Sequence, residues 1–98
     1  MAGMELSVFI RFHARAGQAA ALAAALEAVV PPSRAEPGCV FIQAYRSVQD
    51  ADLFHIHSRW VDEAAFDLHA GLAHTQRFLA TARTLIDHPL EVARTRPL

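Results

Sequence analysis

Apolar and polar residues alternate over residues 6–13 and again over residues 53–60. A period of two is typical of a β-strand that buries one face and exposes the other. Residues 39–48 and 90–95 also have the character of strands, and each follows a turn. In the stretch 53–60, the mainly apolar face carries Phe54, Ile56, Ser58 and Trp60. We expect this face to pack against helices.

Two regions of the chain show helical spacing of their apolar residues. Residues 18–30 place leucine and valine at such intervals on an alanine-rich background. We expect Pro31-Pro32 to end this helix, because proline lacks a backbone N–H and restricts the residue before it. The second region follows Asp62, a good N-cap, and is interrupted at Gly71. It is predicted to form two segments, residues 64–70 and 74–86.

The order of predicted elements is strand, helix, strand, strand, helix, strand. This is the split βαβ, ferredoxin-like topology, an α+β fold in which a four-stranded sheet carries its helices on one face. The length of 98 residues predicts a single domain over residues 1–98. The second face of such a sheet needs a cover.

The composition indicates what packs against the second face of the sheet. Hydrophobic residues make up 53% of the chain and charged residues 19%, which is apolar for so small a core. Burial of the open sheet face in a homodimer accounts for the excess. A net charge of −1 without a basic run argues against nucleic acid as a partner. No apolar run has membrane length, and the N-terminus lacks the charged segment, apolar run and cleavage site of a signal peptide, so we expect a cytoplasmic protein without membrane contact.

Several short motifs add a resemblance to a known family. They are Ser33-Arg34, Glu36-Pro37-Gly38-Cys39, Tyr45-Arg46-Ser47, Trp60 at a strand end, and the histidines His69 and His74 before Phe78. In this order they resemble the antibiotic-biosynthesis monooxygenase family of dimeric αβ-barrel proteins, over about residues 6–92. The resemblance implies a pocket between sheet and helices in each subunit. It also implies a monooxygenase that oxidises a small aromatic or quinol-type metabolite with O2 and without a cofactor.

His69 and His74 are the candidate catalytic residues, because they flank the break at Gly71. Imidazole suits proton transfer near neutral pH. An electron-rich phenol, anthrone or hydroquinone needs no cofactor to react with O2 once it is deprotonated. The alternative is structural: His69 would bond a backbone group at the break, and His74 would cap the next segment.

The candidate substrate-binding residues are mostly aromatic, as suits a flat ligand. They are Trp60, Phe66, Phe78, Phe54, Phe12, Tyr45 and Ser58. The alternative for each is an ordinary place in the core. Arg34 and Arg46 match family positions, and we expect them to form ion pairs with Glu36 or Asp50.

One departure limits how far the resemblance reaches. The family's characterised oxygenases and haem-degrading members often use an asparagine toward the substrate, and this chain contains no asparagine. A non-catalytic ligand-binding dimer stays as an alternative. A haem-binding or haem-degrading protein is a further alternative, and the missing asparagine counts against it. His55 and His57, with His13, could chelate a metal, but we expect their face to meet the second subunit and predict no metal site.

Overall fold

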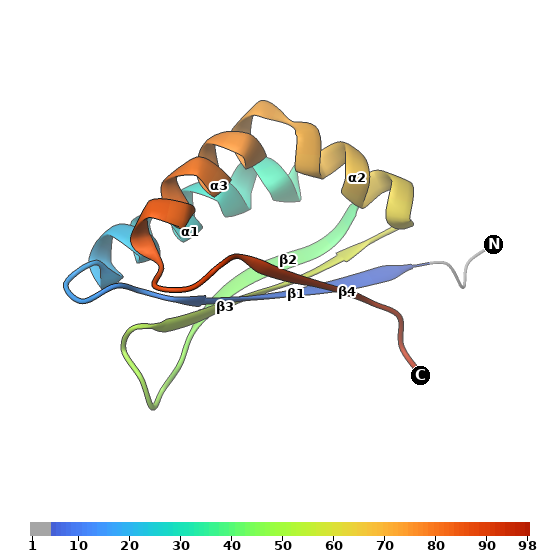
Figure 1. The fold of residues 1–98 in the computed structure, drawn as a ribbon. Helices are drawn as coiled ribbons and strands as arrows, with labels where there is room; N and C mark the ends of the chain where they lie inside the picture. Colours follow the sequence, from blue (N-terminus) through green and yellow to red (C-terminus); the bar gives the residue numbers. More distant parts are fainter. Residues whose placement is uncertain (1–4) are drawn as a thin grey trace.

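The computed structural model describes residues 5–98, as a four-stranded antiparallel sheet with three helices on one face (Figure 1). The elements are β1 (Leu6–His13), α1 (Ala19–Arg34), β2 (Cys39–Arg46), β3 (Leu53–Trp60), α2 (Glu63–Gly71), α3 (Ala73–Leu85) and β4 (Glu91–Thr95). The strand order is β2-β3-β1-β4, so β1 and β3 form the centre of the sheet. The predicted ferredoxin-like α+β fold is confirmed. Over the described range 5–98, no helix has the length and apolar character needed to cross a membrane.

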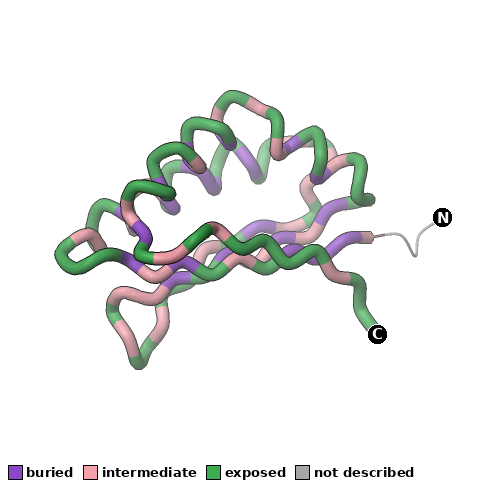
Figure 2. Tube along the Cα trace, in the orientation of Figure 1, coloured by how far each residue is buried: buried purple, intermediate pink, exposed green. Residues whose placement is uncertain are grey.

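The core lies between the sheet and the helices, where the buried parts of both layers face each other (Figure 2). All four residues of β3 that were expected on this face are buried. A larger cluster surrounds Phe12, Leu22 and Phe78 below α1 and α3. A smaller one surrounds Trp60 and Phe66 below α2. The alternation in β3 therefore predicted its buried face correctly.

Helix α1 does not end at the two prolines, contrary to the expectation from the sequence. It continues through Pro31 and Pro32 to Arg34, and the Ala35 N–H donates to the carbonyl of Pro31 at 3.2 Å. Each proline removes one N–H, which leaves the carbonyls of Glu27 and Ala28 without their helical donors. These four residues all lie on the exposed side of the helix. Water can therefore satisfy the free carbonyls, and the helix continues.

The other face of the sheet is open and partly aromatic. Phe9 is 48% exposed, and its ring stacks on that of His57 with centroids 4.6 Å apart. Phe41 contacts the same imidazole, and Arg59 lies over the Phe41 ring. The three helices of residues 5–98 all lie on the opposite face (Figure 1).

His13 lies at the end of β1, where it joins two loops instead of the histidines of the open face. Its Nδ1 contacts Asp87 Oδ2 at 2.8 Å and its Nε2 contacts Asp50 Oδ2 at 3.3 Å. Its backbone N–H donates to Nε2 of His88 at 2.9 Å. Opposite it on β3 stands Leu53, whereas His55 pairs with Arg11. The arrangement of His13 with His55 and His57 considered for a metal is therefore not formed.

The hydrogen bond to Asp87 raises the pKa of His13 above the ordinary histidine value of 6.5. A raised pKa means that the folded state binds this proton more tightly than the unfolded chain does. The stabilisation is complete below the unfolded value and is lost as the pH rises through the folded pKa. We expect urea unfolding to show this loss between mildly acidic and alkaline pH, and His13→Gln to remove it. An unchanged pH dependence in His13→Gln would contradict the assignment.

Candidate functional site

A cavity of about 220 Å³ lies between the sheet and the helices. Its wall is mainly apolar, and it draws on both core clusters, with Ile56 and Phe78 from one and Phe66 from the other. A few of the residues that line the cavity are polar. They are Ser33, Ser58, His69, Thr75, Arg83 and Arg94. Such a cavity suits a small apolar ligand that is oriented by a few polar contacts.

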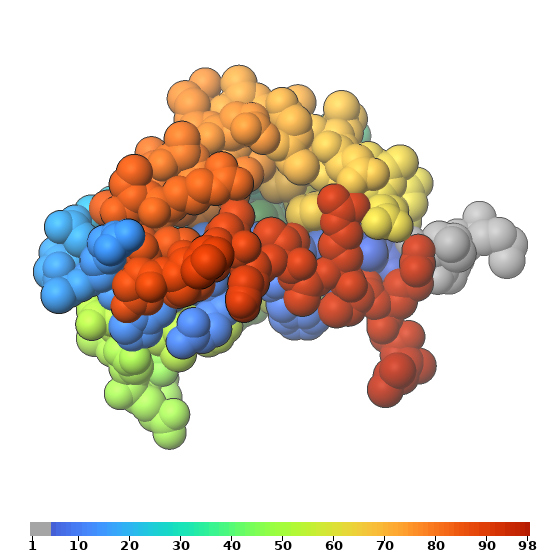
Figure 3. Space-filling view, viewed as in Figure 1, coloured from blue at the N-terminus to red at the C-terminus, as the bar shows by residue number. Residues whose placement is uncertain are grey.

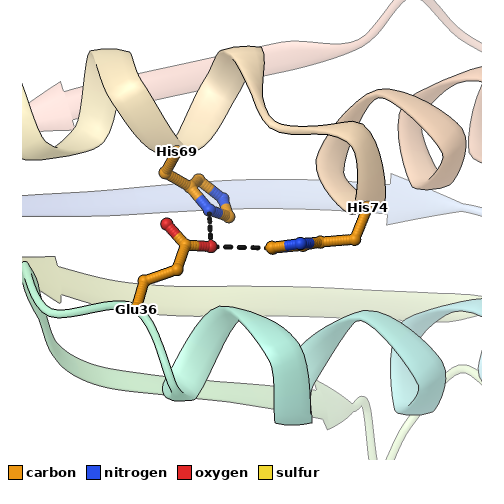
Figure 4. A group of neighbouring side chains, drawn as sticks. All are labelled: Glu36, His69 and His74. Carbon is orange, nitrogen blue, oxygen red and sulfur yellow. Dashed lines mark hydrogen bonds and ion pairs between the residues drawn. The ribbon is translucent and has the colours of Figure 1, made fainter.

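His69 and His74 converge on one carboxylate, that of Glu36 (Figure 4). Oε2 of Glu36 lies 2.7 Å from Nδ1 of His69 and 2.7 Å from Nε2 of His74. The side chains of His69 and Glu36 are only 10% and 11% exposed, and that of His74 is 23% exposed. Hydrogen bonds to a carboxylate in such sheltered surroundings are among the stronger ones in proteins.

The helix break makes this convergence possible. Helix α2 begins at Asp62, whose carboxylate accepts from the Ala65 N–H at 2.8 Å, so the predicted N-cap is confirmed. It ends at Gly71, and Leu72 is extended, with φ −72° and ψ 152°, before α3 begins. The change of direction places His69 on one helix and His74 on the next, on two sides of Glu36 (Figure 4).

Glu36 reaches the histidines from the turn between α1 and β2. This turn lies directly against α2, because the Val61 N–H donates to the Gly38 carbonyl at 2.9 Å. A Cβ on Gly38 would stand only 2.5 Å from Cβ of Ala65, so only glycine fits this close approach. The glycine in the Glu36-Pro37-Gly38 turn thus allows the carboxylate to lie below the helix break.

The contact with Glu36 favours one tautomer of His69 when the carboxylate is ionised. An ionised carboxylate only accepts, so it holds a proton on Nδ1 of His69 and leaves Nε2 as the acceptor. Within residues 5–98, Nε2 has no hydrogen-bond partner, yet every fully buried side-chain nitrogen or oxygen there has one. Nε2 is therefore in contact with open space. His69 itself lines the cavity.

The Trp60 ring packs against the imidazole of His69. Its side chain is completely buried, and the centroids of its ring and the imidazole lie 4.4 Å apart. Its Nε1–H donates to Oγ of Ser58 at 3.0 Å. Trp60 thus restricts the orientation of His69 and also holds Ser58, which lines the cavity.

The structure brings some of the predicted site residues to the cavity and leaves others away from it. His69, Ser58, Phe66 and Phe78 line it. Trp60 lies behind its wall, and Phe12 and Phe54 are buried in the larger core cluster. Tyr45 pairs with His55, and strand alternation turns it to the open face of the sheet, where it is 46% exposed. His74 borders a groove between α1 and α3 instead of the cavity. Its link to the cavity-lining His69 is the shared contact with Glu36.

Glu36 is the residue that the sequence interpretation placed in the wrong role. It forms no ion pair with Arg34 or Arg46, which instead donate to the backbone carbonyls of Ile42 and Ala51. The structural alternatives for the histidines are not what is found either, since both bond this carboxylate. The Glu-Pro-Gly turn was visible in the sequence, but its position below a distant helix break was not.

The same three residues have the atoms of a metal site, with ligand atoms within 4.8 Å of one another. Two ligands of one tetrahedral zinc ion, each about 2.0 Å from the metal, stand about 3.3 Å apart. The contacts of 2.7 Å found here are shorter and have the length of charge-assisted hydrogen bonds. In this structure the three side chains are therefore joined by hydrogen bonds.

The site can now be compared with known proteins. The sequence pattern that defines the antibiotic biosynthesis monooxygenase family matches residues 6–81. The chain belongs to this family. The putative monooxygenase YcnE of Bacillus subtilis is 36% identical over 69 residues, which are 70% of this chain and 73% of that protein. The putative monooxygenase Rv0793 of Mycobacterium tuberculosis is 32% identical over 93 residues, which are 95% of this chain and 91% of that protein.

Solved structures agree with this assignment to the family. The crystal structure of PA3566 from Pseudomonas aeruginosa superposes with a TM-score of 0.91 at 30% identity, covering 100% of this chain and 98% of that one. The structure of Rv0793 gives 0.90 at 31% identity, covering 96% and 95%. The fold of these relatives is thus present over essentially the whole chain.

Proposed function

We propose that this member of the family is a cofactor-independent monooxygenase that oxidises a small aromatic or quinol-type metabolite with O2. Membership of the family and two relatives named as monooxygenases support a monooxygenase-type role. The observation that carries the finer proposal is the orientation of His69. Nδ1 of His69 contacts the Glu36 carboxylate, Nε2 is not fully buried, and His69 lines the apolar cavity.

The proposed first step is removal of a proton from the substrate by Nε2 of His69. Glu36 stabilises the imidazolium that forms, because its carboxylate accepts from Nδ1–H throughout. The apolar wall favours an aromatic ring and keeps water from the reactive carbanion or phenolate. His69 would thus supply a polar contact to the substrate, for which the family's oxygenases often use asparagine.

For an anthrone, the complete reaction balances with O2 as the only co-substrate. The deprotonated ring carbon reduces O2, and a carbon–oxygen bond forms to give a hydroperoxide. Loss of water then turns the original CH2 group into a carbonyl. One oxygen atom remains in the product, and the other leaves in water with the two hydrogens of that carbon.

Oxygen uptake with anthrone and with hydroquinone tests this function. We expect protein-dependent uptake that continues in the presence of a metal chelator. A protein that binds these compounds in the cavity without consuming O2 would instead be the non-catalytic ligand-binding dimer. Uptake that is lost with the chelator would contradict cofactor independence.

We also propose that the functional unit is a homodimer joined through the open sheet faces. The support is the exposed apolar and aromatic set on that face and along the edges of the sheet. It comprises Phe9, Val40 and Tyr45, each between 43% and 48% exposed. Analytical ultracentrifugation at micromolar concentration should give twice the chain mass of 10.7 kDa. A single species with the mass of one chain would overturn the proposal.

A further inference from the structure

The cavity has a second polar end, which the proposed function leaves unused. Arg83 lines the cavity from the last turn of α3, on the side where Leu90 and Val92 border it. Arg83 and Val92 are exposed, so the cavity opens between α3 and the edge strand β4. Figure 3 shows β4 running below α3 and α2 on this face of the molecule. A ligand that enters here meets Arg83 at the mouth.

The two arginines of the cavity differ in their partners. Arg94 donates to Glu63 at 3.0 Å and to Asp67 at 2.7 Å, and its guanidinium lies over the Phe66 ring. Its charge is therefore already compensated. Arg83, by contrast, has no carboxylate within ion-pair distance anywhere in residues 5–98. The only cationic group of the cavity left without a counter-ion, in the described part of the chain, stands at its mouth.

The distance between the two polar ends limits the shape of the ligand. Thr75 contacts Nδ1 of His69 at 3.3 Å, and Arg83 lies eight residues further along α3. At 1.5 Å per residue, this spacing is about 12 Å along the helix axis. The wall between them is apolar and includes Phe78 and Leu79.

We infer that the substrate is an elongated apolar acid, with the group that loses a proton at His69 and an anionic substituent at Arg83. This inference rests on the proposed function, because it takes His69 as the site of deprotonation. The guanidinium would form a two-pronged ion pair with a carboxylate, sulfonate or phosphate. Its position at the mouth leaves the apolar part of the ligand to fill the cavity.

Matched ligands test the inference without turnover. We would measure by calorimetry, in the absence of O2, the binding of 6-hydroxy-2-naphthoate and of 2-naphthol, which lacks the carboxylate. The parent protein should bind the acid about tenfold more tightly than the naphthol, as expected for one charge-assisted hydrogen-bonded pair. Arg83→Gln should remove this preference and leave the affinity for 2-naphthol unchanged.

Arg77→Gln is the matched control. Arg77 is an exposed arginine of the same helix, but it borders the groove between α1 and α3 and not the cavity. It should keep the preference for the acid. An arginine that only stabilises the C-terminal end of α3 would change the melting temperature but not this preference. Equal binding of both ligands by the parent, a preference that persists in Arg83→Gln, or no binding of either ligand would each overturn the inference.

The outcome separates this inference from the proposed function. A protein that binds the acid through Arg83 but consumes no O2 would contradict only the oxygenase. A protein that oxidises neutral substrates and shows no preference for the acid would contradict only the role of Arg83.

Discussion

His69→Gln is expected to lower the rate of substrate-dependent oxygen uptake by about 10²–10⁴-fold, the usual cost of losing a general base. Glutamine keeps a polar group of similar length but cannot accept a proton from the substrate. The binding of an unreactive ligand should change much less than the rate, since only one polar group of a mainly apolar cavity is altered. Initial rates measured with an oxygen electrode decide the matter.

Two further variants divide the cluster by role. Glu36→Gln should also lower the rate, because a neutral amide stabilises the imidazolium less well than the carboxylate 2.7 Å from Nδ1. His74→Gln should have a smaller effect, since His74 acts on His69 only through Glu36. All three variants should keep the circular dichroism spectrum of the parent. Parent-like rates in a folded His69→Gln variant would rule out His69 as the base.

Trp60→Ala is expected to destabilise the fold by about 3–5 kcal/mol, as found for large aromatic residues removed from cores. The side chain is completely buried and contacts Phe66 and His69. The loss is a large part of the total stability of a typical domain, about 5–15 kcal/mol. Urea unfolding measures the change. The protein concentration is kept fixed, because the apparent stability of the proposed homodimer would depend on it.

Two further variants test whether the loss of stability is specific to the Trp60 ring. Leu68→Ala on the same side of the fold should change stability by no more than about 0.5 kcal/mol, because Leu68 is 69% exposed. Trp60→Phe should lie between the parent and Trp60→Ala, since it keeps a ring but loses the donor to Ser58. A Trp60→Ala protein as stable as the Leu68→Ala control would show that the ring is not part of the core.

Local patterns in the sequence were sufficient where neighbouring residues decide the structure. The alternation in β3 predicted its bounds, Leu53–Trp60, and its buried face, because a strand has only two sides. Asp62 was recognisable as an N-cap because its hydrogen bond spans only three residues. The proline pair led to a wrong prediction of where α1 ends. The two prolines remove N–H donors only on the exposed side of α1, and the helix continues to Arg34.

The site itself depended on residues far apart in the chain. His69 and His74 could be selected for their chemistry and their place beside Gly71, but their partner Glu36 lies more than thirty residues away, in a separate turn. Residue type alone could not separate the aromatic residues that line the cavity from those buried in the core. Phe78 lines the cavity, whereas Phe12, whose ring makes an edge contact with the Phe78 ring, does not.

The sequence by itself therefore determined the order of elements, the sheet with its helices on one face, and the membership of the family. These follow from periodicity, capping and short motifs, which act over a few residues. Only the tertiary structure decided that one carboxylate orients two histidines, that Trp60 stands behind the cavity, and that Arg83 lies at its mouth. Those relations depend on how α2, α3 and the Gly38 turn pack together, and packing is a property of contacts between segments distant in sequence.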